Sequence, residues 1–380
     1  MLDMNGRSNV TEDLVLFRDL VQRFFERELV PNLARWDEAG LCDRSFWTAC
    51  GEAGLLCPTV PAEYGGPGLD FRFNAVFDEE LAYAGSSLGM TLHSDIVADY
   101  IIAYGSEEQK QRYLPDMVSG KRVAAIAMTE PGGGSDLKSV RTTAVRRGDR
   151  YVLNGSKLYI TNGQHADLVV VVAKTDPAAG AKGISLICVE VPCTGFVRGR
   201  NLDKIGQHAS DTSELFFEDV EVPVSHLLGQ EGKGFAYLMG QLPQERLSIS
   251  VQAQAMAQRA FDEAVRFTKD RQAFGQRVFD FQNSRFMLAD LAAKLQVGWA
   301  HLDWSIQRYV DGALSATEAA AGKLWHTDLQ WEIADAALQL HGGAGYMNEY
   351  PIARLWRDSR VTRIYGGTNE IMKEVIGRTL

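Results

Sequence analysis

The densest group of residues that could do chemistry is the segment AMTEPGGGSD at residues 127–136. Three consecutive glycines after a proline give a loop whose backbone N–H groups can face a ligand closely, because no Cβ stands in the way. Thr129 and Ser135 add hydroxyl groups that can hydrogen-bond the same ligand. The segment therefore indicates a binding loop, and the alternative interpretation is a mobile surface loop.

A second candidate is the segment YITN at residues 159–162, which ends an apolar run of strand character. An aromatic ring beside a hydroxyl group at that position could stack on a flavin and hydrogen-bond it. Taken alone, Tyr159 is more typical of a packing residue, so this segment gains its meaning from the motifs elsewhere in the chain.

Several widespread catalytic motifs are absent from the sequence. Gly343-Ala-Gly345 is followed by Tyr-Met-Asn and does not fit GxGxxG, and there is no GxxxxGK[ST] or HExxH. These absences remove the direct assignments to hydride transfer from NAD, phosphoryl transfer and zinc hydrolysis. No CxxC is present, so we expect no metal site and interpret the five scattered cysteines as reduced thiols: Cys42, Cys50, Cys57, Cys188 and Cys193.

The secondary structure expected of the elements that position these segments changes twice along the chain. Apolar residues recur at helical spacing up to about Gly120, short runs of strand type follow, and a helical pattern returns from Gly234. Asn154-Gly155 lies between two strand-like runs and predicts a hairpin turn. The expected fold class is α+β and multidomain, with helical residues 1–122, a middle β-barrel or sandwich domain at residues 123–230, and helical residues 231–380.

Composition narrows the functional class further. A chain of 380 residues with a formal net charge of -10 argues against nucleic acid as a partner. The N-terminal segment MLDMNGRSNV has no apolar signal core, and no apolar run approaches the ~20 residues of a membrane span. We therefore expect a cytoplasmic protein without integral membrane contact.

Five motifs occur in the order found in one enzyme family. They are MTEPGGGSD at residues 128–136, ITNG at 160–163, RQAFG at 271–275, QLHGGAGY at 339–346 and IYGGTNE at 364–370. Together they resemble the acyl-CoA dehydrogenase family across nearly the whole chain. QLPQERL at residues 241–247, YGGTNEIMKE at 365–374, and the segments HSDIV and GSEEQ near residues 93–109 are most similar to its long-chain branch. His93 itself is interpreted as a hydrogen-bonded core or helix-face residue.

The resemblance implies a C-terminal four-helix bundle and an FAD cofactor bound without a Rossmann domain, which accounts for the missing GxGxxG. Thr161 would hydrogen-bond the flavin ring, with Tyr159 beside it, and Ser135 would lie near the pyrophosphate and the CoA chain. The cofactor residues implied are Met128, Thr129, Gly134, Ser135, Tyr159, Ile160, Thr161, Arg271, Gln282, Gln339, Leu340, His341, Gly342, Gly343, Thr368, Asn369 and Glu370. The substrate residues implied are Ser135, Lys182, Gly183, Gln244, Arg246, Tyr365, Gly366 and Gly367.

The same resemblance implies partners. Arg271, Gln282, Gln339 and Gly343 would bind the adenine end of an FAD held by a neighbouring subunit. The protein would then be a homo-oligomer, commonly a homotetramer. An acyl-CoA would be the substrate and an electron-transferring flavoprotein would receive the electrons.

The catalytic base is the point at which this sequence departs from many family members. They place a glutamate in Tyr-Glu-Gly-Thr near the C-terminus, whereas this chain has Gly366 there. The long-chain and isovaleryl branches carry their base in the segment that here contains Glu245, which we expect at the start of a helix. Glu245 is therefore the predicted base, its pKa raised by burial, and the backbone N–H of Gly366 remains available to an oxyanion. Without the resemblance, Glu245 could equally be a solvated glutamate.

The expected reaction is FAD-dependent α,β-dehydrogenation of a fatty acyl-CoA to the trans-2-enoyl-CoA in β-oxidation, on a medium, long or branched chain. Rival interpretations are a dehydrogenase of carrier-protein-bound acyl groups, an acyl-CoA oxidase, and a non-enzymatic flavin-binding relative. The usual length of oxidases and the retention of Glu245 argue against the last two.

Overall fold

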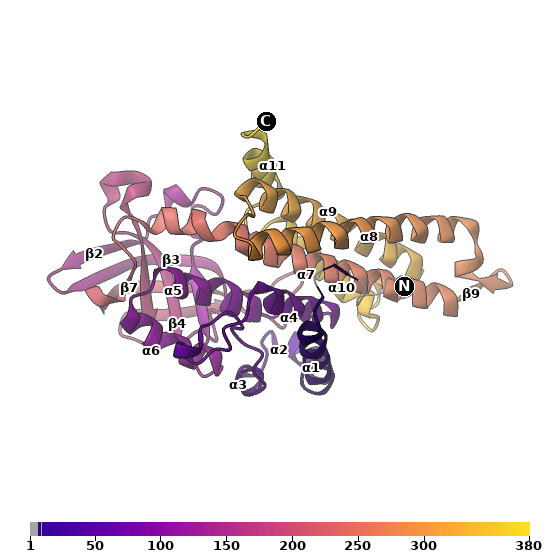
Figure 1. Cartoon of the computed structure of the whole chain (residues 1–380), viewed down its shortest axis with the longest axis horizontal. Helices are drawn as coiled ribbons and strands as arrows, with labels where there is room; N and C mark the ends of the chain where they lie inside the picture. Colours follow the sequence, from indigo (N-terminus) through magenta and orange to yellow (C-terminus); the bar gives the residue numbers. More distant parts are fainter. Residues whose placement is uncertain (1–6, 9) are drawn as a thin grey trace.

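The computed structural model of the chain describes residues 7, 8 and 10–380. Helices, then strands, then helices follow one another along the chain and form three adjoining regions (Figure 1). This order agrees with the expected fold class. The expectation about a leader concerns residues 1–6, which lie outside the described residues, and the bounds predicted for the three domains stay predictions. Within the described residues, no helix combines the length and apolarity that crossing a lipid bilayer would need.

The N-terminal region consists of short helices, several with side-chain caps. Ser106 accepts a hydrogen bond from Gln109 N, and the Gln109 side chain accepts one from Ser106 N, which satisfies two backbone donors at one helix end. A π-helical stretch, η4 (Leu92–Val97), precedes α5. The helices are α1 (Glu12–Glu28), α2 (Leu33–Ala39), α3 (Arg44–Glu52), α4 (Phe71–Tyr83), α5 (Ala98–Tyr104) and α6 (Glu107–Val118).

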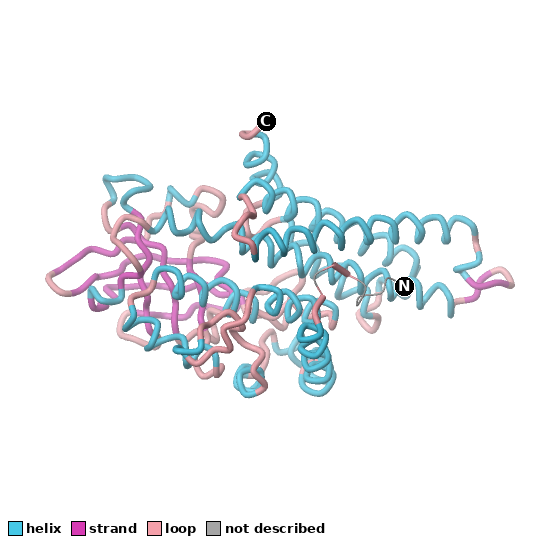
Figure 2. Tube along the Cα trace, viewed as in Figure 1, coloured by secondary structure: helices cyan, strands magenta, loops and turns pink. Residues whose placement is uncertain are grey.

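The middle region is a β-sheet, in which the strands lie in the order β6-β7-β3-β2-β4-β5-β8 and β1 pairs parallel to β4 (Figure 2). Strand β4 is buried on both faces, because alternate residues point into two different apolar cores. This explains its uninterrupted run of valines. The strands are β1 (Ala124–Ala127), β2 (Thr143–Arg147), β3 (Arg150–Thr161), β4 (Leu168–Lys174), β5 (Ile184–Glu190), β6 (Phe196–Asn201), β7 (Thr212–Pro223) and β8 (Leu227–Leu228).

The hairpin predicted at Asn154-Gly155 is wrong, because both residues lie inside the continuous strand β3. The pairing of β3 with β7 shifts its register between Leu153 and Gly155, which marks a β-bulge. Glycine is required at 155 because a Cβ would lie 2.5 Å from Thr142 Oγ1. The turn of the hairpin is at Gly148, between β2 and β3.

The C-terminal region is built on three long helices that run side by side (Figure 1). Helix α7 passes through Pro243, so the prediction that a helix begins near Glu245 is wrong. A proline usually ends a helix because it lacks an N–H, and that rule misplaced the helix start. The helices are α7 (Gly234–Asp270), α8 (Gln282–Val310), α9 (Ala316–His341), α10 (Pro351–Ser359) and α11 (Asn369–Gly377), with the hairpin β9 (Gln272–Ala273) and β10 (Gln276–Arg277) between α7 and α8.

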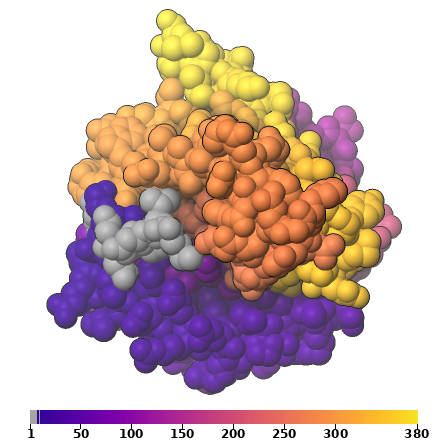
Figure 3. Space-filling model, turned by 90° about the vertical axis from the view of Figure 1, so that its right-hand side faces the viewer, coloured from indigo at the N-terminus to yellow at the C-terminus, as the bar shows by residue number. Residues whose placement is uncertain are grey.

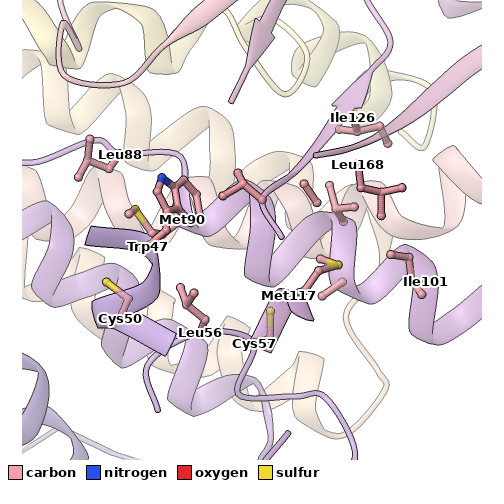
Figure 4. Packing of buried hydrophobic residues seen from close by; sticks show 14 of the residues in the cluster. Trp47, Cys50, Leu56, Cys57, Leu88, Met90, Ile101, Met117, Ile126 and Leu168 are labelled. Carbon is pink, nitrogen blue, oxygen red and sulfur yellow. The ribbon is translucent and has the colours of Figure 1, made fainter. Parts of the chain in front are cut away.

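An apolar core joins the N-terminal helices to the sheet, with Trp47 and Met117 on one side and Ile126 and Leu168 on the other (Figure 4). His93 is fully buried at this junction. Its Nδ1 accepts a hydrogen bond from Ala124 N at 3.1 Å, and its Nε2 lies 3.0 Å from the carbonyl oxygen of Met117. The ring is therefore a neutral tautomer that donates from Nε2, and burial lowers the pKa of His93 to about 4. It is the core residue that the sequence predicted.

Candidate active site

A cavity of about 500 Å³ lies where the three regions meet. The N-terminal region contributes the segment before α5, the sheet contributes the glycine-rich loop and the end of β3, and the C-terminal region contributes α7 and the turn before α11. Of the residues that the sequence singled out, those lining the cavity are Met128, Thr129, Gly134, Ser135, Tyr159, Ile160, Thr161, Glu245, Arg246, Tyr365, Gly366 and Gly367.

Helix α7 forms one wall of the cavity with residues spaced three or four apart, which places them on one helical face. This face extends for about 25 Å at 1.5 Å per residue. Most of its members are apolar, and Glu245 is the acidic side chain among them. The residues are Phe235, Met239, Leu242, Glu245, Ile249 and Gln252.

Glu245 is a buried carboxyl group, 5% exposed, whose Oε1 accepts a hydrogen bond of 2.9 Å from the hydroxyl of Tyr100. Burial raises the pKa of Glu245 to about 7, against the opposing effects of the Tyr100 hydrogen bond and the Arg246 charge. A carboxyl group with this pKa exchanges a proton near neutrality, as a general base must. The sequence missed Tyr100, since a tyrosine in a helix 145 positions away gives no local signal.

Gly366 and Gly367 face α7 from the turn before α11, and both have left-handed backbone conformations, with φ of 65° and 90°. A Cβ at residue 366 would lie 2.3 Å from Ile249 Cδ1. A glutamate at this position would therefore combine an unfavourable φ with a steric clash. The turn accommodates glycine, while the carboxyl group of this site is on α7.

The turn is held from behind by Lys323, a fully buried lysine of α9. Its Nζ donates to the carbonyl oxygen of Gly367 and to Asn369 Oδ1, both at 2.9 Å. Desolvation lowers the pKa of Lys323 to about 7, and the nearby Arg246 charge adds to that effect. The side chain of Asn369 is thus bonded within the protein.

The wall on the sheet side fits a flat, polar-edged ring. Tyr159 has a φ of 61°, unusual for a residue other than glycine, and its side chain is 64% exposed at the cavity. Asn162 also has a positive φ, and its Nδ2 donates to the carbonyl oxygens of Gly89 and Ala124. This strained strand end presents an aromatic face beside the hydroxyl of Thr161, and these residues fit the isoalloxazine of FAD.

Comparison with known proteins identifies the family. Residues 11–121, 125–220 and 232–380 match the models of the N-terminal, middle and C-terminal domains of acyl-CoA dehydrogenase. A long-chain specific acyl-CoA dehydrogenase, mitochondrial, from Sus scrofa is 47% identical over 383 aligned positions, covering 100% of this chain and 89% of the relative. The chain belongs to the acyl-CoA dehydrogenase family.

Solved structures agree with this acyl-CoA dehydrogenase assignment. The crystal structure of acyl-CoA dehydrogenase from Geobacillus kaustophilus has a TM-score of 0.97 and 48% identity, covering 98% of this chain and 99% of that one. The structure of butyryl-CoA dehydrogenase from Megasphaera elsdenii has a TM-score of 0.94 and 34% identity, covering 100% of this chain and 99% of that one. The protein is thus an FAD-dependent oxidoreductase that dehydrogenates acyl-CoA thioesters.

The remaining predicted site residues of this acyl-CoA dehydrogenase do not line the cavity. Lys182 and Gly183 lie in the turn before β5, Gln244 is buried behind Glu245, and Thr368 caps α11. The others lie in the first turn of α11 or at the far end of the helical bundle, near the hairpin β9–β10, in the part of the molecule that faces the viewer in Figure 3. They are Asn369, Glu370, Arg271, Gln282, Gln339, Leu340, His341, Gly342 and Gly343.

We expect Gly366→Ala to lower the free energy of unfolding by about 1–3 kcal/mol, because alanine in a left-handed conformation is strained and its Cβ meets Ile249. Urea unfolding of the purified protein measures the loss. The matched control is Gly343→Ala, where no atom lies within 4 Å of the added Cβ and φ is not left-handed. Equal stability of the two variants would contradict the assigned conformation.

Proposed function

We propose that Glu245 is the base that removes the α-proton of the acyl-CoA substrate. The observation that carries this proposal is a buried carboxyl group with a pKa of about 7 on the apolar cavity wall. The other carboxylates of the cavity wall, Asp136 and Glu374, are both exposed. Burial gives Glu245 a proton affinity that an exposed carboxylate lacks.

The enolate-like charge that develops on the thioester oxygen needs donors in the same place. Gly366 lies at the cavity and has a backbone N–H. Because its φ is left-handed, this residue is not part of a regular helix, so its N–H can donate to the thioester oxygen. Arg246 is 5% exposed, and its Nε has no hydrogen-bond partner among the described residues, so it can orient the turn or support Glu245. FAD, when bound, supplies the acceptor for the β-hydride. Thr161, Tyr159 and the loop around Ser135 are proposed to hold it.

The proposed substrate is a medium- or long-chain or branched fatty acyl-CoA in β-oxidation. Support for the long-chain assignment comes from the 47% identity to a relative named for that specificity. Tyr365 and Ser135, which line the cavity, are proposed to place the thioester, whereas Lys182, Gly183 and Gln244 lie off its lining and stay predictions as substrate contacts. A cytoplasmic location stays a prediction, since the relatives include mitochondrial and bacterial proteins.

The base is tested by mixing the yellow holoenzyme anaerobically with palmitoyl-CoA and following the flavin absorbance near ~450 nm. We expect the wild type to lose this absorbance and Glu245→Gln to retain almost all of it, because a carboxamide cannot accept the α-proton. Glu374→Gln is the matched control, since it removes another carboxylate from the same cavity.

Loss of absorbance in Glu245→Gln would contradict the assignment of the base. If Glu374→Gln were the inactive variant, the base would lie on α11. If FAD were bound but the wild type did not react, palmitoyl-CoA would be the wrong substrate, and shorter, branched and carrier-bound thioesters would be compared.

Replacing Tyr100 by Phe should move the acidic limb of the activity profile to higher pH. The Tyr100 hydroxyl donates to the Glu245 carboxylate and favours its charged form, so its loss raises the pKa of Glu245 further. The base works when deprotonated, and a hydrogen bond to a charged group contributes about 1.5 kcal/mol or more, so the shift should be about one pH unit. The pH dependence of kcat/KM measures this shift. A shift of the acidic limb to lower pH would contradict the assigned role of the Tyr100 hydroxyl.

We further propose a homotetramer that passes electrons to an electron-transferring flavoprotein. Arg271 lies about 39 Å along α7 from Glu245, at 1.5 Å per residue, which exceeds the length of an extended dinucleotide. We therefore propose that Arg271 contacts the FAD of a neighbouring subunit. A candidate contact surface is the row of exposed apolar residues on α8 and α9, namely Phe286, Val297, Trp304 and Trp325.

Trp304→Glu should shift the oligomer toward smaller species and lower its FAD content, because a charge would be buried in the subunit contact. Light scattering after size-exclusion chromatography gives the mass, and absorbance gives bound flavin per chain. Leu16→Glu is the control, since Leu16 is 62% exposed on α1, outside the proposed surface. An unchanged mass in Trp304→Glu would place the contact elsewhere.

A further inference from the structure

Helix α4 carries three consecutive buried acids, Asp78, Glu79 and Glu80, which are 0%, 3% and 7% exposed. Glu79 forms ion pairs with Arg7 and Arg18, and Glu80 forms one with Arg18. Asp78 has no ion pair among the described residues. Since a buried carboxylate without a cation is costly, its charge must be removed in another way.

The carboxyl group of Asp78 interacts with that of Asp95 in the π-helix η4, and we infer a hydrogen bond between the two groups. Ionised carboxylates only accept hydrogen bonds, so such a contact requires a proton on one of them. Burial and the Asp95 charge raise the pKa of Asp78 well above its usual range. The geometry of the pair therefore calls for one proton shared between the two groups.

The hydrogen bonds around the pair show which group is the donor. Asp95 Oδ1 accepts from Asn74 Nδ2 at 2.8 Å, and Asp95 Oδ2 accepts from Ser248 Oγ at 2.7 Å, as a carboxylate would. Asp78 Oδ1 accepts from Thr91 Oγ1 at 2.5 Å, while Asp78 Oδ2 has no donor among the described residues. Oδ2 is therefore the atom that carries the proton.

We propose that protonated Asp78 and ionised Asp95 form a lock that positions Glu245, so that both are positioning residues for the reaction. Ser248, which donates to Asp95, lies one helical turn after Glu245 on α7. Tyr100, which donates to Glu245, lies on α5, directly after η4. These two hydrogen bonds, and a third from Gln252 Nε2 to Thr91 Oγ1 at the start of η4, hold the η4–α5 segment against α7, and Asp78 fixes that segment to α4. The functional part of this inference rests on the proposed role of Glu245.

The surroundings of the pair do not favour a second negative charge. The titratable groups that interact with it from the neighbouring elements are Glu79, Asp99, Cys57, Tyr309 and Tyr365. Each is an acid that is either negative or neutral. Loss of the shared proton would add a like charge among them, so it would loosen the lock.

Asparagine substitutions test the assignment because a carboxamide can replace a protonated carboxyl group but not an ionised one. In Asp78→Asn the amide can still donate to Asp95 and accept from Thr91, so we expect kcat within about threefold of the wild type. In Asp95→Asn an NH2 group would face the donors of Asn74, Ser248 or Asp78. This leaves a buried donor without an acceptor. We therefore expect kcat to fall by about tenfold or more, with KM little changed.

The reverse ranking of the two variants, equal losses, or no loss in either would each overturn the proposal. Should Asp95→Asn fail to fold, Ser248→Ala removes the hydrogen bond from α7 to Asp95, together with the acceptor of Gln244 Nε2, and keeps the Asp95 carboxylate. It should lower kcat and shift the acidic limb of the pH profile, and an unchanged profile would overturn the positioning role.

Thermal unfolding across pH keeps this test separate from the test of the base. The pKa of Asp78 is higher in the folded protein than in the unfolded chain, so the pair's stability is present at low pH and is lost as pH rises through the folded pKa. Asp78→Asn cannot lose that proton and should show a smaller fall in Tm than the wild type as pH rises above the pKa of an ordinary aspartate. An equal fall would overturn the shared proton. This readout holds even if another residue proves to be the base.

Discussion

The site depends on the cost of placing a carboxylate away from water. An unpaired buried charge is unfavourable by several kcal/mol, and a protein avoids it by pairing or by protonation. At Glu245 the compensation is partial, with one hydroxyl donor and a nearby guanidinium, so the pKa settles near 7. Incomplete compensation leaves the group able to gain and lose a proton, which a fully paired carboxylate such as Glu79 cannot do near neutrality.

The need to accommodate a buried carboxyl group also explains the shape of the cavity wall opposite α7. The turn at Gly366 and Gly367 lies so near α7 that a side chain would meet Ile249. The two glycines leave room for backbone to approach the carboxyl group across the cavity. The base and the backbone donor are thus offered by two elements whose separation is fixed by Lys323 behind the turn and by the bundle core behind α7.

Much of the fold was predictable because its signals are local. The valines of β4 and the helical spacing of α8 depend on neighbours within the same element. The hairpin prediction at Asn154-Gly155 was wrong because the same dipeptide suits a turn and a bulge. Only the close approach of Thr142 decides between the two. The predicted helix start near Pro243 was wrong because tertiary packing keeps α7 helical on both sides of this proline. Glu245 was predicted through family motifs, whereas Tyr100 and the Asp78–Asp95 pair required contacts between distant segments.

The uninterrupted course of α7 has a consequence for motion. The turn that carries Glu245 continues directly into residues such as Val251 and Ala255, which belong to the packed core of the bundle. Segments of this kind open only with a large part of the structure, so their backbone amides exchange slowly with solvent. The carboxyl group of Glu245 therefore belongs to one of the most rigid parts of the molecule. Entry of a thioester must therefore rely on the exposed glycine-rich loop at the cavity.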